Sequence, residues 1–143
     1  MGRRSNGLTM PLPYEYNSSN MGFNERFILI DDNRRDAQDI FNEMTSAGHV
    51  IAGYASSYEE GINLVSEIDR YNASVIILDG NLNFHREDCG DGKEIARLIR
   101  EKSGIKIVAH SSSKKEIANF GDIFVAKQAR YGTLAEVVSA IPR

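Results

Sequence analysis

Runs of apolar residues alternate with amphipathic stretches along most of this chain. A run of about four to eight mainly apolar residues is typical of a strand that is buried on both faces of a parallel sheet. The pattern predicts five strands. They are residues 27–30 (FILI), 75–78 (VIIL), 105–109 (IKIVA) and 123–126 (IFVA), with a weaker one at 50–55 (VIAGYA).

The stretches between these runs have the spacing of helices with one apolar face. They are residues 36–47, 58–71, 93–102 and 133–141, and Thr133 lies in the N-cap region of the last. Strands that alternate with helices indicate an α/β fold with a parallel sheet covered on both faces. Five strands and about five helices suit a flavodoxin-like, doubly wound five-stranded sheet with the strand order 2-1-3-4-5.

The beginning of the chain lacks this alternation. Residues 1–24 are rich in Gly, Asn, Ser and Pro and show no hydrophobic periodicity. Such a segment buries too little apolar surface to offset the entropy that is lost on ordering. We therefore predict a flexible N-terminal tail at 1–24 and a single domain at 25–143.

Composition and charge exclude several classes of protein. The 143 residues are 41% hydrophobic and 26% charged, as in an ordinary soluble domain. A net charge of −3 argues against a nucleic-acid partner, which needs a basic surface. No apolar run reaches the roughly 18 to 20 residues that span a bilayer, so no membrane association is predicted. The single cysteine, Cys89, cannot form an internal disulfide, which favours a cytoplasmic location.

Polar side chains follow four of the predicted strands at their carboxyl ends. Asp31 and Asp32 follow the first strand along the chain, and Asp79 follows the third. Ser111 and Lys127 follow the fourth and fifth strands. In a doubly wound sheet these ends form one edge, and ligands bind there at the point where the strand order reverses. We therefore expect these five side chains to meet in one cleft.

Three carboxylates in one cleft repel one another, so a divalent cation is their natural partner. An all-oxygen, carboxylate-rich and partly hydrated site favours Mg²⁺. Once the cation has neutralised the site, one carboxylate can act as a nucleophile toward a phosphoryl group. The charge on the transferred oxygens then needs a cation and a hydrogen-bond donor, and Lys127 and Ser111 have this chemistry.

In combination these residues resemble the receiver domain of response regulators in two-component signal transduction. The likeness rests on the acidic pair in ILIDDN, the lone acid in VIILDGN, the hydroxyl in VAHSSS and the lysine in IFVAK. It extends over residues 27–141, nearly everything except the predicted tail. The combination is specific, whereas any one of the acids alone is a weak indication.

The resemblance implies a phosphoacceptor and a metal site. Asp79 would be the residue that is phosphorylated. Asp32 would bind Mg²⁺ directly, and Asp31 would contribute mostly through water. Asp79 itself and the backbone carbonyl of Asn81 would complete the protein ligands.

The resemblance also implies contacts to the phosphoryl group and a conformational switch. Lys127 would pair with the aspartyl phosphate, and Ser111 would donate a hydrogen bond to it. Phe124, three residues before Lys127, matches the aromatic residue that changes rotamer on activation in the family. It is interpreted equally well as a core aromatic, so both readings of Phe124 stay open.

Three features of the sequence depart from the family pattern. The Met-Pro pair that usually follows the phosphoacceptor is absent, and a long loop, GNLNFHREDCGDG, precedes the next helix. Gln128 follows Lys127, where the family prefers proline. Between Ser111 and Phe124 there is room for little more than a stub of the fourth helix, which in the family belongs to the surface that reports phosphorylation. We therefore expect phosphorylation chemistry with a remodelled output surface.

Several other polar residues have simpler interpretations. The loop at 83–91 fits no zinc motif, and we expect it to be solvated, with Cys89 as an exposed thiol. Arg34 and Arg35 are expected on a solvated helix face, where one of them could brace Asp31 or a partner's phosphate. His110 should point to the face opposite Ser111, and we interpret it as structural.

The expected function is that of a stand-alone receiver. It would accept a phosphoryl group from a histidine kinase or a histidine phosphotransfer protein and signal by protein–protein contact. No DNA-binding module follows the domain in this sequence. The domain would not be an enzyme beyond self-catalysed phosphoryl transfer and autodephosphorylation.

Three alternatives are weighed against this expectation. A degenerate receiver that binds partners without phosphorylation is compatible with the short fourth helix. A Mg²⁺-dependent phosphohydrolase of the haloacid-dehalogenase type needs a D-x-D arrangement, but Asn33 and Arg34 stand two residues after Asp31 and Asp32. A flavodoxin-type cofactor carrier needs a phosphate-binding loop, where DDNRRD places carboxylates.

Overall fold

The computed structural model describes residues 24–82 and 89–142, so the predicted tail lies almost wholly outside the described residues. Five strands form one parallel sheet with the order β2-β1-β3-β4-β5, as predicted. The strands are β1 (Arg26–Ile30), β2 (Val50–Ala55), β3 (Val75–Leu78), β4 (Lys106–Ser111) and β5 (Ile123–Ala126). The strand order reverses between β1 and β3, which places a binding edge at their carboxyl ends.

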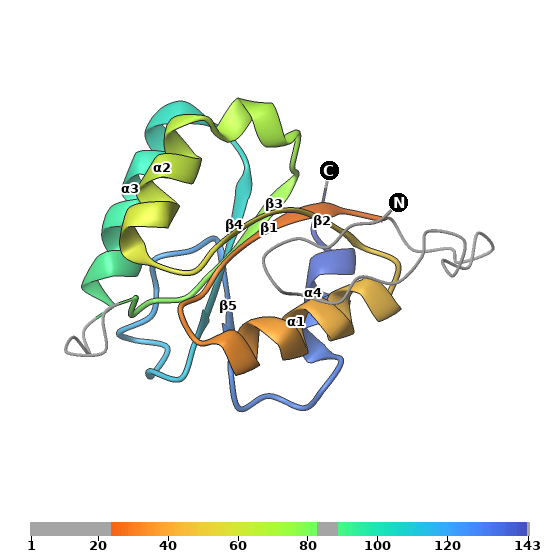
Figure 1. Ribbon diagram of the computed structural model, residues 1–143. Helices are drawn as coiled ribbons and strands as arrows, with labels where there is room; N and C mark the ends of the chain where they lie inside the picture. Colours follow the sequence, from red (N-terminus) through yellow and green to blue (C-terminus); the bar gives the residue numbers. More distant parts are fainter. Residues whose placement is uncertain (1–23, 83–88, 143) are drawn as a thin grey trace.

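Helices cover both faces of this sheet (Figure 1). One face carries α1 (Arg34–Ser46) and α4 (Thr133–Ser139), and the other carries α2 (Tyr58–Ser66) and α3 (Gly90–Lys102). The alternation of burial along β1 and β3 explains the two layers. Phe27, Leu29, Val75 and Ile77 face α1 and α4, whereas Ile28, Ile30, Ile76 and Leu78 face α2 and α3, and all are at most 1% exposed.

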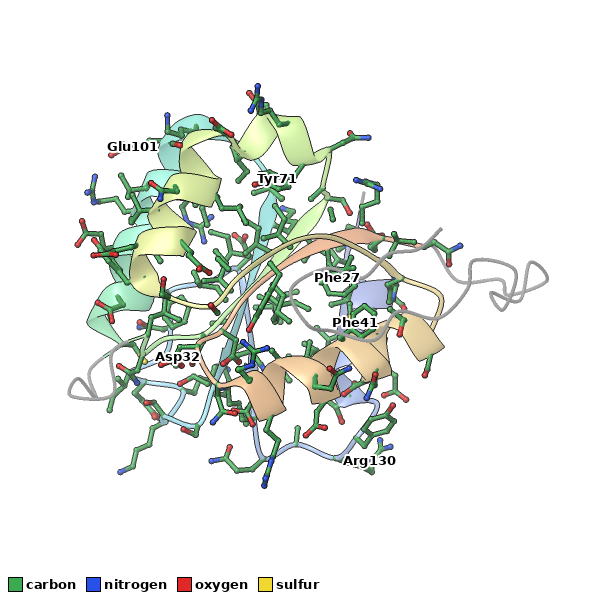
Figure 2. All side chains as sticks on the ribbon, viewed as in Figure 1. Phe27, Asp32, Phe41, Tyr71, Glu101 and Arg130 are labelled. Atoms are coloured by element: carbon green, nitrogen blue, oxygen red, sulfur yellow. The ribbon has the colours of Figure 1, made fainter. Side chains whose placement is uncertain are left out.

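The first helix illustrates how local sequence and packing agree. Asn33 caps α1, because its side chain accepts a hydrogen bond from the backbone N–H of Asp36 at 2.9 Å. Ala37, Ile40 and Phe41 of α1 are buried against the sheet, and Figure 2 shows Phe41 beside Phe27 of β1. The cap fixes where the helix begins, and this apolar stripe fixes which side of it faces the strands.

The helical expectations need four corrections, and the first is that α1 begins at Arg34, two residues before the predicted start. The stretch at 58–71 is not one helix, because Glu67 leaves the helical region and a 3₁₀ turn, Ile68–Tyr71, follows with Ile68 buried. Helix α3 begins at Gly90, three residues before the predicted start. Thr133 is the first residue of α4 and not its cap; Gly132 precedes it with φ 98°, a conformation that glycine adopts readily. The described residues therefore hold four α-helices and one 3₁₀ helix.

The connection between β4 and β5 contains no α-helix and is anchored by side chains instead. Ala118 and Phe120 are buried, at 0% and 8% exposed. The Asp122 carboxylate accepts hydrogen bonds from the backbone N–H of Ile107 at 2.8 Å and from Arg100 at 3.1 Å. These contacts close the connection over the sheet edge without a helix.

None of the helices within residues 24–82 and 89–142 is long and apolar enough to cross a membrane.

Candidate functional site

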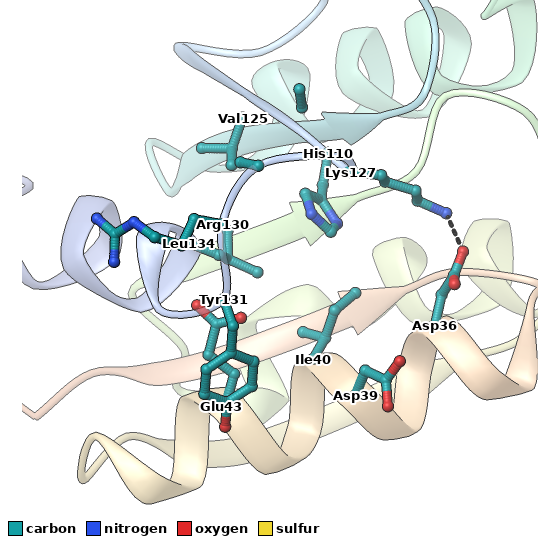
Figure 3. Close-up of a pocket in the computed structure, with 12 residues that line it drawn as sticks. Asp36, Asp39, Ile40, Glu43, His110, Val125, Lys127, Arg130, Tyr131 and Leu134 are labelled. Carbon is teal, nitrogen blue, oxygen red and sulfur yellow. Dashed lines mark hydrogen bonds and ion pairs between the residues drawn. The ribbon is translucent and has the colours of Figure 1, made fainter.

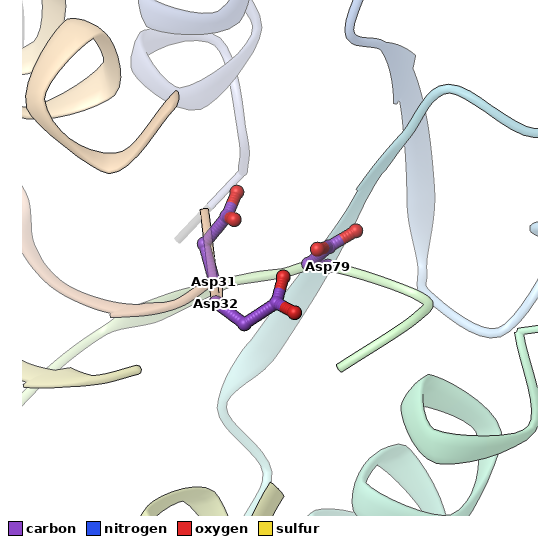
Figure 4. Close-up of side chains that lie close together, drawn as sticks. All are labelled: Asp31, Asp32 and Asp79. Atoms are coloured by element: carbon purple, nitrogen blue, oxygen red, sulfur yellow. The ribbon is translucent and has the colours of Figure 1, made fainter. Parts of the chain in front are cut away.

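Two neighbouring strands bring the acids together. Ile30 of β1 lies opposite Leu78 of β3, so the residues that follow them, Asp31 and Asp79, are side by side at the sheet edge. The backbone N–H of Asp79 donates to Ile30 O at 2.9 Å, which extends the ladder to the acid itself. One carboxylate oxygen from each of Asp31, Asp32 and Asp79 lies within 4.8 Å of the others (Figure 4). The predicted acid cluster is therefore present in the structure.

The three acids differ in exposure. Asp31 is 1% exposed and Asp79 is 6% exposed, whereas Asp32 is partly exposed. The cleft therefore opens to solvent on the side of Asp32. Carboxylates with so little solvation need a cation or protons to offset their charge.

Lys127 supplies one such cation. Its backbone N–H donates to Ser111 O at 2.9 Å, which fixes the lysine at the end of β5. Its ammonium nitrogen lies 3.0 Å from Asp31 Oδ2 and 3.5 Å from Asp79 Oδ2. A third carboxylate, Asp36 of α1, is the nearest of all at 2.9 Å. Asp36 is not among the predicted site residues, although its spacing from Asn33 is that of a capping box, which places it in the first helical turn.

The electrostatics of the cluster follow from burial and crowding. Burial and the charge of Asp31 raise the pKa of Asp79 to about 7, and Lys127 offsets this only in part. Burial also raises the pKa of Asp31, and its effect exceeds that of the nearby Lys127 ammonium. Burial lowers the pKa of Lys127, but the carboxylates of Asp31 and Asp79 and the bond to Asp36 outweigh it, so its pKa is raised on balance. The site therefore holds more negative charge than its one ammonium neutralises.

Asn81 and Cys89, which lie before and after residues 83–88, are hydrogen-bonded to each other. Asn81 accepts a hydrogen bond from the backbone N–H of Cys89 at 2.9 Å, and its own backbone N–H acts to lower the pKa of Asp79. Cys89 is fully buried with φ 60°, and its Sγ lies 3.8 Å from Ser111 Oγ. The expectation of an exposed thiol was wrong, because Cys89 is the point where the loop turns into α3. The role of the Asn81 carbonyl as a metal ligand stays a prediction.

The hydroxyl and the aromatic residue of the predicted switch lie on the α2–α3 side of the sheet. Ser111 is 1% exposed, and its Oγ accepts a hydrogen bond from the backbone N–H of Ser113 at 3.0 Å. Ser112 is exposed, so Ser111 is the hydroxyl that points inward. Phe124 is half-buried and packs against the same apolar cluster as Phe120. The structure therefore gives Phe124 a packing role, and its role as a switch stays a prediction.

His110 lies on the opposite side from Ser111. It lines a cavity of about 350 Å³ between α1 and the end of β5, together with Ile40, Lys127 and Leu134 (Figure 3). Burial, followed by the nearby charge of Lys127, lowers the pKa of His110 to about 4. Its Nδ1 is buried without a hydrogen-bond partner within the described part of the chain.

The acid cluster suits a hard divalent cation. Its candidate ligands are carboxylate oxygens on two adjacent strand ends, and Asp32 leaves room for water. This chemistry fits Mg²⁺ better than a transition metal, which favours nitrogen or sulfur ligands. Arg34 and Arg35 are exposed, and it is Lys127 and not an arginine that pairs with Asp31.

Comparison with known proteins identifies the fold. The sequence matches no protein-family model and no curated protein. Its structure is similar to the signal receiver domain of the putative response regulator NarL from Mycobacterium tuberculosis. The TM-score is 0.66 at 18% identity, over 80% of this chain and 93% of that one. The chain has the receiver-domain fold.

Two further receiver structures support this conclusion. The CheY-like response regulator receiver domain from Methylobacillus flagellatus has a TM-score of 0.65 at 16% identity, over 84% of this chain and 100% of that one. The N-terminal domain of a response regulator/sensory box/GGDEF protein from Carboxydothermus hydrogenoformans has a TM-score of 0.64 at 20% identity, over 79% and 90%. At such identities the likeness concerns the receiver fold, and function has to be argued from the site.

Proposed function

We propose that this receiver-fold domain is a phosphoacceptor that takes a phosphoryl group onto Asp79 from a histidine kinase or a histidine phosphotransfer protein. The observation that carries the proposal is the meeting of Asp31, Asp32 and Asp79 within 4.8 Å, with the Lys127 ammonium beside them. A surface turn of acids would show neither the burial of Asp31 and Asp79 nor a shared lysine.

The reaction is a phosphoryl transfer between two side chains. A carboxylate oxygen of Asp79 attacks phosphorus, the N–P bond of the partner's phosphohistidine breaks, and the released imidazole takes up a proton. Asp79 must be ionised to attack, and its burial opposes that with a pKa of about 7. A cation in the cleft favours the ionised form, because opposite charge lowers the pKa of a carboxylate.

The remaining residues hold the participants in place. Asp31, Asp32, Asp79 and the Asn81 carbonyl would hold Mg²⁺, which supplies charge neutralisation for the phosphoryl oxygens. Lys127, already 3.5 Å from Asp79, would pair with the phosphoryl group. The Ser111 hydroxyl would leave the side of Cys89 to donate a hydrogen bond to it. The domain would act in the cytoplasm, by protein contact and without binding nucleic acid.

A second candidate is a receiver that binds its partner without phosphorylation. The contact between Ser111 and Cys89 favours it, because the Ser111 hydroxyl is buried and lies 3.8 Å from the buried cysteine sulfur. The helix-free connection between β4 and β5 favours it too, since an altered output surface can work without a phosphoryl signal.

Incubation with acetyl phosphate and Mg²⁺ separates these functions. We expect a mass increase of one phosphoryl group that is stable in acid and labile in base. The adduct should be lost in Asp79→Asn and kept in Asp39→Asn, which changes an exposed acid on α1. Absence of any adduct together with absence of Mg²⁺ binding would leave the phosphorylation-independent module. Steady hydrolysis of a phosphate ester would instead indicate a phosphohydrolase.

A further inference from the structure

The ammonium of Lys127 is shared by three carboxylates, and one of them does not belong to the acid cluster. Asp36 lies in the first turn of α1, and its Oδ2 is 2.9 Å from Lys127 Nζ. The corresponding distances are 3.0 Å for Asp31 and 3.5 Å for Asp79. The resting lysine is therefore closer to the helix than to the residue proposed as phosphoacceptor.

The Lys127 ammonium is surrounded by carboxylates, and its contact with Asp36 is a hydrogen bond. An ammonium has three N–H donors, and three carboxylates lie within 3.5 Å of it. The Lys127 side chain is 15% exposed and that of Asp36 is 37% exposed, so water competes little at the lysine and more at Asp36. A phosphoryl group on Asp79 adds oxygen acceptors beside a lysine that is already paired with three carboxylates. One existing contact has to yield, and the most solvated carboxylate is the least costly to release.

We propose that Asp36 is a positioning residue that holds Lys127 in the resting state and releases it when Asp79 carries a phosphoryl group. The inference rests on the proposed function. It adds that the Asp36 carboxylate competes with the phosphoryl group for Lys127. Release leaves the Asp36 carboxylate without its cation. The charge state of Asp79 is thereby passed to the surface of α1.

Release of Asp36 from Lys127 would change the charges that line the cavity beside α1. Asp36 and Lys127 line it at one end, and Figure 3 shows their ion pair next to His110. The charges of both Lys127 and Asp36 act on the His110 imidazole, whose Nδ1 is unpartnered within the described residues. This cavity lies on the opposite face of the sheet from Phe120 and Phe124. The His110 ring is therefore a reporter of the Asp36–Lys127 contact on the face of the sheet opposite Phe120 and Phe124.

The test uses beryllofluoride, a non-covalent mimic of the phosphoryl group, at saturating Mg²⁺. Asp36→Asn should tighten beryllofluoride binding by about threefold to fivefold, because Lys127 no longer has to leave a charged partner. Asp39→Asn is the matched control; it removes an exposed acid from the next turn of the same helix and the same cavity rim, and it should change the affinity little. In a Lys127→Ala background, Asp36→Asn should have no effect.

The NMR signals of the His110 imidazole provide a second measurement. A purely structural role of Asp36 would not produce the following pattern of shifts. In the wild type they should shift when beryllofluoride binds, and in free Asp36→Asn they should already lie displaced toward the bound position. Equal effects of Asp36→Asn and Asp39→Asn, or a tightening that persists without Lys127, would overturn the role of Asp36. A wild-type protein that binds no beryllofluoride would refute the proposed function, and this inference with it.

Discussion

The edge of the sheet at the carboxyl ends of the strands has two halves whose stability depends on different interactions. The charged half consists of Asp31, Asp32, Asp36, Asp79 and Lys127. It has four carboxylates for one ammonium, and burial raises the pKa values of Asp31 and Asp79 within it. Its energy depends on protons and cations, because buried charges of one sign repel unless they are compensated.

The neutral half consists of Gly80, Cys89, Gly92, Ser111 and Phe120. Its members are held by close contact: a Cβ on Gly92 would lie 2.8 Å from Gly80 Cα and 3.0 Å from Phe120 Cζ. Its energy depends on volume, because close-packed atoms cannot yield to extra ones. The difference means that the stability of the charged half depends on compensating charge, whereas that of the neutral half depends on close packing.

The largest effect is expected from overfilling the neutral half. Gly92→Ala places a methyl group 2.8 Å from Gly80 Cα and 3.1 Å from Asp79 O, both backbone atoms that cannot move away easily. We expect the free energy of unfolding in urea to fall by about 3 kcal/mol. Gly104→Ala is the matched control, because a Cβ there has no neighbour within 4 Å, and its effect should stay within about 0.5 kcal/mol. Similar values for both variants would show that the neutral half is not tightly packed.

The next largest effect is an increase in the free energy of unfolding, and it is expected from a substitution in the charged half. Asp79→Asn removes a buried carboxylate whose ionised form is disfavoured in the folded state. Without Mg²⁺ at about pH 8, the variant should unfold with a free energy about 2 kcal/mol higher than the wild type. Saturating Mg²⁺ should reduce this gain, because the cation favours the wild-type carboxylate. A destabilised variant would contradict the view that repulsion dominates this half.

The pH dependence of this difference sharpens the comparison. The pKa of Asp79 is about 7 in the folded protein and 3.8 for a free aspartate side chain, which represents the unfolded chain. Between these two pH values the folded state therefore binds more protons than the unfolded state. Stability of the wild type should therefore fall as the pH rises through this window, relative to Asp79→Asn. The advantage of the variant should approach zero toward about pH 4. Urea unfolding of both proteins at several pH values tests this, and a constant difference would exclude a raised pKa at Asp79.

The smallest effect is expected from underfilling the neutral half. Cys89→Ala removes the sulfur that lies 3.8 Å from Ser111 Oγ and leaves a small void. We expect a loss of about 1 kcal/mol in the free energy of unfolding. The loss should be the same with and without Mg²⁺ and should not vary between pH 5 and 8 by more than about 0.3 kcal/mol. A loss that depends on Mg²⁺ would show that the two halves are coupled.

The parts of the site that follow directly from strands could be predicted from the sequence. Asp31, Asp79 and Lys127 each come immediately after an apolar run, and the run fixes where the strand ends. Parallel strands in a known order bring their ends to one edge, so strand assignment alone places these side chains near one another. The same reasoning placed Ser111 at the edge and His110 on the opposite face.

Residues on helices and loops were less accessible to such reasoning. Asp36 reaches Lys127 only because the Asn33 cap starts α1 two residues before the predicted beginning and the buried stripe of the helix sets its rotation. Cys89 lies in a loop rich in charge, which in the sequence resembles solvated chain. Its burial depends on the Asn81 side chain and on contact with Gly80, neither of which any local pattern reveals.

The sequence by itself determined the layered α/β architecture, the strand order and the edge where the acids gather. Hydrophobic periodicity is a local property that marks each strand and helix, and the doubly wound topology of such an alternation supplies the strand order and the edge. The tertiary structure decided which carboxylates share Lys127, how far burial raises the pKa values at the site, and that Cys89 lies against Ser111. Distances and desolvation arise only when separate segments pack, because both depend on atoms that are remote in sequence.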